Sequence, residues 1–360
     1  MALDQKDFAI IGAFDKFGAK ASAEQLSEVL GIPSRTVRYR LSRLKKKGIL
    51  HPPRAMTHER KVGLGEASVC MKATRLGATH LPAILDELAP FYWMTESYGS
   101  YDGFLAHAVY SLDSPDSIPL LIIALKEEGL VEDYHIFDIV DYEYKRANYE
   151  YLRPDMCWNW DWKLWYKSIK RNLKGKLKFT FRMDENPQVV NFDSKDIDVL
   201  RHLGRNGEST QRHLAEALSL SETGASKRVQ RLEKAGVIKG YKSTIIPSIS
   251  QFSHCFFLEI EEPVERVLSS LYQLPFPLCI MMESRTRFCI RLGLLASDFA
   301  CFLKGFDLLR PSLLSYFFQT LHNPRRTSSS HPFEFYNEDS AIWDIPSDSI
   351  SIIREHLKKR

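Results

Sequence analysis

The chain has 360 residues, of which 44% are apolar and 26% are charged, and its formal net charge is +4. This composition is typical of a globular protein with about two to four domain cores, and it argues against a disordered or fibrous chain. No apolar run is long enough for a signal peptide or a membrane span, so we expect a cytoplasmic protein with no membrane partner. The six cysteines form no C-x-x-C pair, which favours buried, reduced thiols over a zinc site or a disulfide framework.

Positive charge is concentrated in two windows of the sequence. Residues 1–60 contain 12 Lys and Arg against 6 Asp and Glu, and residues 192–247 contain 10 against 7. The two windows therefore carry +6 and +3, which leaves −5 for the remainder of the chain. Such a distribution is expected of polyanion-binding modules attached to a neutral or acidic body.

The first window, residues 1–60, predicts a winged helix-turn-helix built from three short helices. In its third helix Val37, Leu41 and Leu44 recur at helical spacing and face the core, and Gly48 is the expected C-cap. Outward-facing basic and polar side chains there can pair with phosphates or reach guanine edges. These candidate DNA-binding residues are Arg35, Thr36, Arg38, Tyr39, Arg40, Arg43, Lys45, Lys46 and Lys47, with Arg54 in the wing that follows.

Residues 61–145 alternate between strand-like and helical segments. The apolar strand "EASVCMKA" precedes a helix over residues 81–88, and "YWMTES" and "GFLAHAVYSL" precede a helix over residues 117–128. Residues 131–144 have the pattern of one final strand. The order βαββαβ predicts a ferredoxin-like domain, in which helices cover one face of an antiparallel sheet.

Residues 146–190 form a Trp-rich connector followed by a basic linker. Trp158, Trp160 and Trp162 alternate, so a strand would place all three indoles on one face, buried against a domain. Stacking on single-stranded nucleic acid is the alternative, but acidic residues lie among these rings. The run "KSIKRNLKGKLK", residues 167–178, is either a solvated linker or a further phosphate contact.

The second window repeats the first at a distance of 188 positions. "RVQRLEKAGVI" at residues 228–238 aligns with "RLSRLKKKGIL" at 40–50, so residues 191–247 predict a second winged helix-turn-helix. Asp193, Ser209 and Ser221 are the expected N-caps of its helices. Residues 248–322 repeat the βαββαβ pattern, and residues 323–360 form an aromatic extension and tail. The candidate DNA-binding residues of this copy are Thr223, Ser226, Lys227, Arg228, Gln230, Arg231, Lys239 and Lys242.

The stretch from "FDSKDIDVL" to "KGYKSTI", residues 192–245, resembles the winged helix-turn-helix of the Lrp/AsnC (leucine-responsive and asparagine-regulator) transcription factors, and residues 3–54 resemble it too. The resemblance implies an α+β chain in which each winged helix is followed by a ferredoxin-like regulatory domain. In "ESYGSYDGF", Gly99, Tyr101 and Asp102 match the G-x-Y-D turn that the family places near its effector site. The second repeat has "ESRTRF" instead and lacks this turn.

These observations predict a DNA-binding transcription regulator that is not an enzyme and has no catalytic residue, metal or cofactor. The expected partner is double-stranded DNA. One chain would form an internal pseudo-dimer and bind two unlike half-sites. Binding of a small-molecule effector and assembly of two chains into a homodimer are left open. Two alternatives remain. Siroheme decarboxylases resemble the same family and hold an acidic tetrapyrrole with His and Arg, for which His107, His254 and Arg287 are scattered candidates. A winged helix that binds only protein partners is the other alternative.

Overall fold

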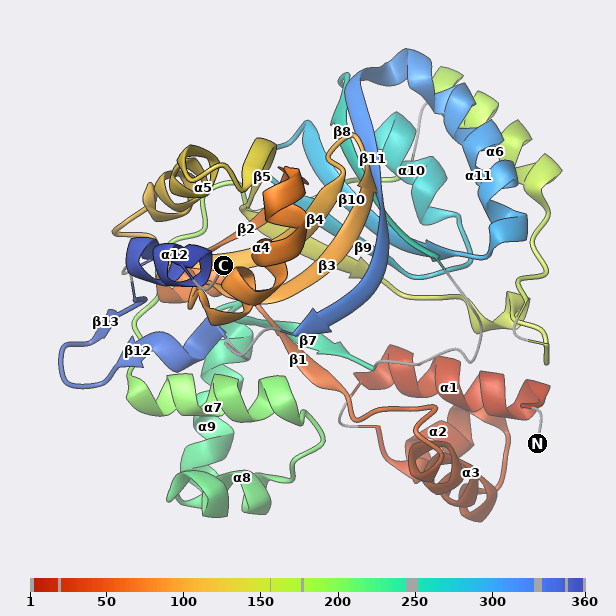
Figure 1. Cartoon of the computed structure of the whole chain (residues 1–360). Coiled ribbons are helices and arrows are strands. Elements are labelled where there is room, and N and C mark those ends of the chain that lie inside the picture. Colours follow the sequence, from red (N-terminus) through yellow and green to blue (C-terminus); the bar gives the residue numbers. More distant parts are fainter. Residues whose placement is uncertain are drawn as a thin grey trace.

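The first winged helix contains three helices at one end of the molecule (Figure 1). The computed structural model describes residues 3–18, 21–155, 157–175, 178–243, 252–326, 332–346 and 349–358. The helices are α1 (Gln5–Phe17), α2 (Ala23–Leu30) and α3 (Ser34–Lys46). Asp4 and Ser22 begin α1 and α2 with capping boxes, in which the cap side chain and the third helical residue satisfy each other's backbone N–H groups.

The second winged helix repeats this arrangement with α7 (Ser194–Arg205), α8 (Gln211–Leu218) and α9 (Glu222–Lys234). Asp193 and Ser221 accept the capping hydrogen bonds at α7 and α9, as the sequence predicts. The expected cap at Ser209 is wrong by one residue, because Thr210 accepts from His213 N and begins α8. Figure 1 shows the two winged helices side by side below the sheets.

Two ferredoxin-like domains follow the winged helices, which confirms the predicted α+β class. The first contains β2 (Leu64–Ala73), α4 (Arg75–Glu87), β3 (Phe91–Gly99), β4 (Gly103–Ser111), α5 (Ser117–Glu127) and β5 (Val131–Ile139), in the strand order β5-β2-β4-β3. The second contains β8 (Phe252–Ile260), α10 (Glu265–Tyr272), β9 (Leu278–Met282), β10 (Arg287–Leu294), α11 (Ala296–Leu309) and β11 (Leu313–Arg326), in the order β11-β8-β10-β9.

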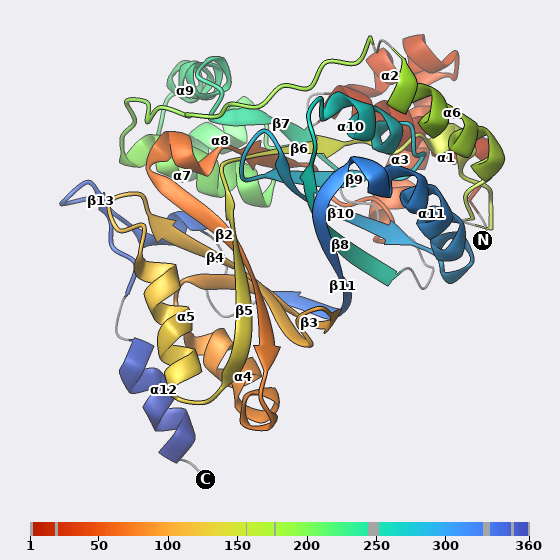
Figure 2. The same ribbon diagram turned by 90° about the horizontal axis from the view of Figure 1, so that it is seen from above.

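The two domains share one nine-stranded sheet, because β11 pairs with β3 across the repeat. The single strand predicted over residues 131–144 is wrong: the chain bends at Val140, and β6 (Asp141–Lys145) leaves β5 to pair with β9 of the second domain. The first and last strands of the sheet, β5 and β6, are thus consecutive, and the sheet curls so that its inner faces meet. Helices cover the outer faces (Figure 2), while residues of both copies form the inner core, including Cys70, Phe137, Cys255 and Phe257.

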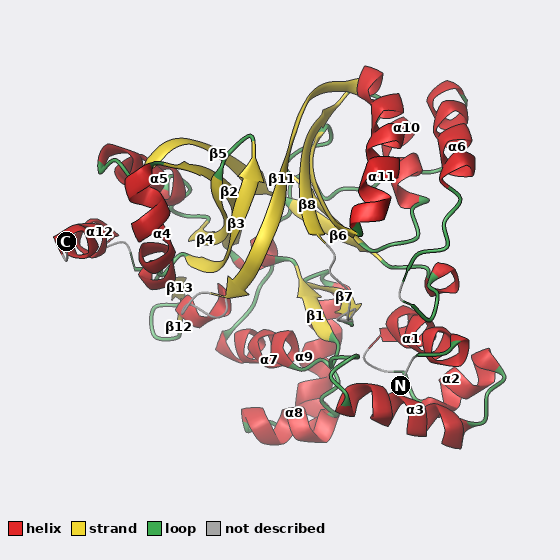
Figure 3. Ribbon diagram, turned by 45° about the vertical axis from the view of Figure 1, so that its right-hand side comes forward, coloured by secondary structure: helices red, strands yellow, loops and turns green. Residues whose placement is uncertain are grey.

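The wings join the two copies. A winged helix-turn-helix predicted for each copy implies that each wing pairs within its own copy, but β1 (Arg54–Thr57) of the first pairs antiparallel with β7 (Ile238–Lys242) of the second. The physical reason is that each strand leaves an unpaired edge, which the other satisfies. The remainder of the second predicted wing, residues 244–251, lies outside the described residues. Figure 3 shows the β1 and β7 pair between the sheets and the helical heads.

The Trp-rich connector is not a strand. After η3 (Tyr149–Tyr151), Trp158 forms an isolated bridge with Leu152, and Trp162 begins the helix α6 (Trp162–Lys174). All three tryptophans nevertheless pack against the core of the second ferredoxin-like domain, as the docking interpretation predicts, and Trp158 also packs against the core of the first winged helix.

The C-terminal extension packs back onto both copies. It contains η5 (Pro332–Phe335), β12 (Tyr336–Asn337), β13 (Ile342–Trp343) and α12 (Ser349–Lys358). Trp343 donates its indole N–H to the carbonyl of Val62 at 2.6 Å, and Ile353 is buried in the core of the first ferredoxin-like domain. The remaining short elements are η2 (Glu59–Val62) and η4 (Arg310–Ser312). Among the described helices, none is both long and apolar enough to span a bilayer.

Candidate functional site

In the first winged helix, two of the predicted DNA contacts are internal. Asp7 on α1 is 1% exposed and accepts from Arg40 at 2.8 Å and from Arg43 at 2.5 Å. Asp4 accepts from the same Arg40 at 2.7 Å. Because a buried carboxylate needs such partners, these arginines bind α3 to α1.

The second winged helix has the same arrangement of a buried aspartate with two arginines, which we call the clamp. Asp196 is fully buried and accepts from Arg228 at 2.9 Å and also from Arg231. Asp193 accepts from Arg228 at 2.7 Å. The arginines that repeat between the two copies in the sequence therefore bind the third helix to the first helix within each winged helix, which we also call a head.

Two further predicted contacts pair with protein groups, and a third faces a cavity. Lys45 pairs with Glu208 of the second head at 2.5 Å, and Lys239 pairs with the buried Asp141. Lys242 lines the cavity described below. The candidates that keep an exposed side chain on the recognition helices are Arg35, Arg38, Tyr39, Lys46, Lys47, Thr223, Lys227, Gln230 and Arg231, while Thr36 and Ser226 are half-buried and Arg54 is exposed in the wing.

The turn predicted to bind an effector packs against the second copy. Gln319 of β11 donates to the carbonyl of Tyr101 and accepts from its N–H at 3.2 Å. A Cβ at Gly99 would lie 2.4 Å from the carbonyl oxygen of Phe318, so the glycine is required for the β3–β11 contact. Asp102 is exposed. The turn therefore contributes to the contact between β3 and β11 at the junction of the two domains.

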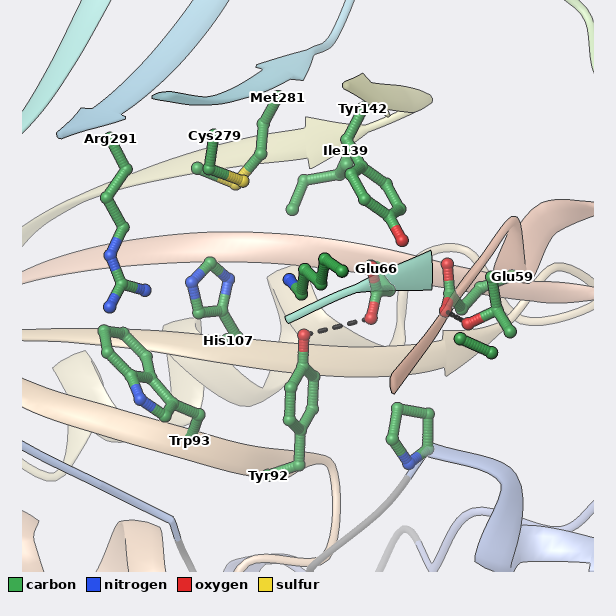
Figure 4. Close-up of a pocket in the computed structure, with 14 residues that line it drawn as sticks. Glu59, Glu66, Tyr92, Trp93, His107, Ile139, Tyr142, Cys279, Met281 and Arg291 are labelled. Carbon is green, nitrogen blue, oxygen red and sulfur yellow. Dashed lines mark hydrogen bonds between the residues drawn. The ribbon is translucent and has the colours of Figure 1, made fainter. Parts of the chain in front are cut away.

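A cavity of about 290 Å³ lies at the junction of the two ferredoxin-like domains, beneath the joined wings (Figure 4). We call it the composite cavity because both copies contribute to it. Ligand cavities occur preferentially at such domain junctions. Its walls are Ala55, Thr57, Glu59, Glu66, Tyr92, Trp93, His107, Ile139, Tyr142, Lys242, Cys279, Met281, Arg291 and Pro332.

One end of the composite cavity is cationic and aromatic. The guanidinium carbon of Arg291 lies 4.7 Å from the centre of the Trp93 ring, and the His107 ring lies tilted against the same indole, with the ring centres 4.8 Å apart. Burial, together with the charge of Arg291, lowers the pKa of His107 to about 3, so its imidazole is neutral. The Nδ1 atom of His107 is buried and has no hydrogen-bond partner among the described groups.

The other end holds two carboxyl groups. Glu66 accepts a hydrogen bond from the Tyr92 hydroxyl at 3.0 Å, and Glu59 accepts one from Thr57. Burial raises the pKa of Glu66 to about 7, and burial with the nearby charge of Glu66 raises the pKa of Glu59 well above its usual range. A carboxyl group poised near neutrality in a cavity is a candidate general acid or base.

The sequence names only part of this site. His107 lies in the cavity, but His254 stacks on Phe299 at 4.4 Å and Arg287 pairs with Glu283, so these two candidates lie elsewhere. Arg291 and Glu66 are missed. The available signal is a charged residue within an apolar strand, as in "RFCIRLGLL" and "LGEASVCM", because charges are rarely buried without a purpose.

The comparisons with known proteins agree on the winged helices. A family model described as "Winged helix-turn-helix DNA-binding" matches residues 3–50 and 192–239. A transcriptional regulatory protein, DoeX of Halomonas elongata, is 48% identical over 52 residues, and the leucine-responsive regulatory protein of Haemophilus influenzae is 42% identical over 57. These matches cover 14% and 16% of this chain and span about a third of the relatives' length, 33% and 34%.

Over the whole chain, the fold is similar to a solved structure of a siroheme decarboxylase, NirDL. The TM-score is 0.57 and the identity 10%, with 98% of this chain and 99% of the other covered. This likeness concerns the fold, which has the same tandem architecture. The structure of AsnC from E. coli covers 39% of this chain at 18% identity, with a TM-score of 0.31. The chain therefore carries twice a winged helix-turn-helix that is similar to that of the Lrp/AsnC-type regulators.

Proposed function

We propose that the chain is an enzyme of the siroheme-decarboxylase type, which removes carboxyl groups from an acidic tetrapyrrole bound in the composite cavity. The observation that carries the proposal is the placement of Arg291, His107 and Glu66 around one cavity, where burial raises the pKa of Glu66 to about 7. The whole-chain fold likeness supports it. The expectation from the sequence that the chain is not an enzyme stays an opposing prediction.

The charges of the cavity suit an acidic substrate. Arg291 and Lys242 supply positive charge, and the raised pKa values of Glu59 and Glu66 allow both acids to be neutral when a substrate carboxylate enters. The rings of Trp93 and Tyr142 offer flat apolar surface to a conjugated ring. The cavity lies at the small end of ligand sites, so a tetrapyrrole would enter by one carboxyl-bearing edge.

The chemistry assigns one task to each group. Decarboxylation breaks one C–C bond, releases CO₂ and leaves an electron pair on the substrate carbon, which takes up one proton. Arg291 would hold one substrate carboxylate at its end of the cavity through a charge-assisted hydrogen bond and so position the ring edge. At the other end, Glu66, held by Tyr92, would donate the proton to the carbon that loses its carboxyl group there and would regain one from solvent.

The test is an anaerobic incubation of the purified full chain with siroheme, followed by mass measurement of the tetrapyrrole. The proposal predicts products lighter by one CO₂ for each carboxyl group lost. Glu66→Gln should form them far more slowly, whereas Lys227→Ala on α9, outside the cavity, should match the wild type. Unchanged siroheme with the wild type would reject the proposal.

A DNA-binding regulator is the second candidate, favoured by the exposed cations on α3. Arg35, Arg38, Lys46 and Lys47 point to solvent, although Arg38 also pairs with the exposed Glu24. Specific binding to a DNA site would support this function if the affinity falls steeply with salt. For each phosphate contacted, log K should fall by about 0.9 per log unit of salt concentration. Two unlike half-sites per chain are expected, since the exposed faces of α3 and α9 differ. Affinity independent of salt would exclude it.

A further inference from the structure

A second basic surface lies on α6, which follows the Trp-rich connector. Lys163, Lys167, Lys170, Arg171 and Lys174 all have exposed side chains. Successive spacings of four, three and four residues place the four lysines in one stripe along the helix. At 1.5 Å per residue the stripe is about 17 Å long.

The opposite face of α6 is fixed to the second ferredoxin-like domain. Trp165, 1% exposed, donates its indole N–H to the carbonyl of Ser270 at 2.8 Å, and Asn172 donates to the Ser270 hydroxyl at 3.0 Å. A Cβ at Gly305 of α11 would lie 2.0 Å from the Trp165 ring, so the glycine permits this close approach. The helix cannot rotate without breaking these contacts, and its lysines therefore face outward permanently.

No acid on α6 or on the described surface around it neutralises the stripe. The helix sequence WKLWYKSIKRNLK contains no Asp or Glu, and within the described part of the chain no ion pair forms with its cations. Like charges three and four residues apart, such as Lys163 with Lys167 and Lys170 with Lys174, destabilise a helix by about 0.2–0.5 kcal/mol per pair. A polyanion on this face removes that repulsion.

The apolar residues of α6 decide which polyanion fits. A helix that binds a membrane surface needs an exposed apolar face, but the apolar face here, with Trp165 and Ile169, is buried in the protein core. Leu164, 63% exposed, is alone among the large apolar side chains described on α6 in being mostly exposed. A row of cations without an apolar face matches a phosphodiester backbone.

We propose that α6 binds the phosphate backbone of double-stranded DNA without regard to base sequence. Figures 1 and 3 show α6 at the end of the molecule away from α3 and α9, so this surface is separate from the winged helices. The proposal does not depend on the enzyme function, because no group of the composite cavity takes part in it.

The experiment compares two triple variants of the full chain on a short duplex of random sequence. The first is Lys163→Gln with Lys167→Gln and Lys170→Gln. The matched control removes as many exposed cations from the first ferredoxin-like domain and the tail, in Arg75→Gln with Lys126→Gln and Lys358→Gln. The α6 variant should reduce the slope of log K against log salt by about 2 to 3, and the control should leave it unchanged.

Two further arms keep the test decisive. The triple Lys→Arg variant at the same three positions should retain the wild-type slope, because it keeps the charge. In a co-sedimentation assay with vesicles that contain anionic phospholipid, the wild type and the triple Lys→Gln variant should bind to the same extent. An unchanged slope in the α6 variant, equal loss in the control, or lysine-dependent vesicle binding without a change in the DNA slope would each overturn the proposal.

Discussion

The two winged helices share their internal contacts and differ on their surfaces. Asp7 binds two arginines of α3, and Asp196 binds the two arginines at the matching positions of α9. On the outer faces, Arg35, Arg38 and Tyr39 of the first copy stand where the second has Thr223, Ser226 and Lys227. The buried Asp–Arg pairs that the copies share are required for each winged helix to fold. The exposed residues in which the copies differ are available for function.

The two ferredoxin-like domains show the same division. Trp93 and Ser68 flank His107 in the first sheet, and Cys279 and Cys255 flank Arg291 in the second, so His107 and Arg291 hold matching positions. By the same register, Glu66 faces Val109, and its counterpart Ser253 faces Gly293. The copies keep the fold and differ where the composite cavity needs a cation, an imidazole and an acid.

The largest expected effect comes from removing the acid of the first copy. Glu66→Gln should reduce the rate of decarboxylation by about 10²–10⁴-fold, the usual contribution of a general acid, while Ser253→Ala should change it little. Because burial raises the pKa of Glu66 to about 7, the protonated donor is present below this pH and is lost above it. The wild-type rate should therefore fall as the pH rises through about 7. A pH profile that is the same in wild type and Glu66→Gln would contradict this role.

The clamps of the two heads should be unequal in strength. Asp7→Ala removes the buried carboxylate that Arg40 and Arg43 share, and both arginines are only 18% exposed, so we expect about 3 kcal/mol of lost stability in the first winged helix. Asp196→Ala should cost less, because Arg228 and Arg231 are 25% and 50% exposed and regain water. Amide hydrogen exchange of α3 and α9 measures the two losses. A larger loss of stability in the second winged helix would show that the exposure of the arginines does not determine how much each variant is destabilised.

At the matching cavity positions, the charged side chain should matter more than the neutral one. Arg291→Ala should raise KM for the acidic substrate by about 30-fold, equivalent to about 2 kcal/mol, because a buried carboxylate loses its partner. His107→Ala should raise KM less, since its imidazole is neutral. Steady-state kinetics on both variants provide the measurement, and equal effects would argue against an anionic group at Arg291.

The smallest effect is expected on the outer faces of the recognition helices. Arg35→Ala should reduce the slope of log K against log salt for duplex DNA by about 1, as expected for one lost phosphate contact. Thr223→Ala at the matching position of α9 should leave the slope unchanged. Filter binding over a range of salt concentrations measures both, and a loss at Thr223 alone would reverse the assignment of the two heads.

Local patterns made the heads predictable from the sequence. Asp193 and Ser221 cap helices whose apolar positions recur at helical spacing, and these signals lie within a few residues of one another. The direction of the arginines was not predictable in this way, because Arg40 faces Asp7 across a distance of 33 positions. Helical spacing alone cannot separate a solvated charge from one that binds a neighbouring helix.

The joined wings and the composite cavity depend on contacts that no local pattern encodes. The pairing of Arg54 with Lys242, and the approach of Arg291 to Trp93, each join segments nearly 200 positions apart. The bend at Val140 moves β6 to the other domain, where Val140 N donates to the Met282 carbonyl at 2.8 Å. The strands themselves were predictable, but their arrangement follows from closing the sheet around a shared core.

The most direct test of the central claim is a crystal structure of the full chain grown anaerobically with the acidic tetrapyrrole. We expect a ring edge in the composite cavity, with one carboxyl group at the Arg291 guanidinium and a second carboxyl-bearing carbon near Glu66. A tetrapyrrole bound elsewhere, for example at the turn of Gly99, Tyr101 and Asp102, or a cavity still empty at saturating ligand, would contradict it.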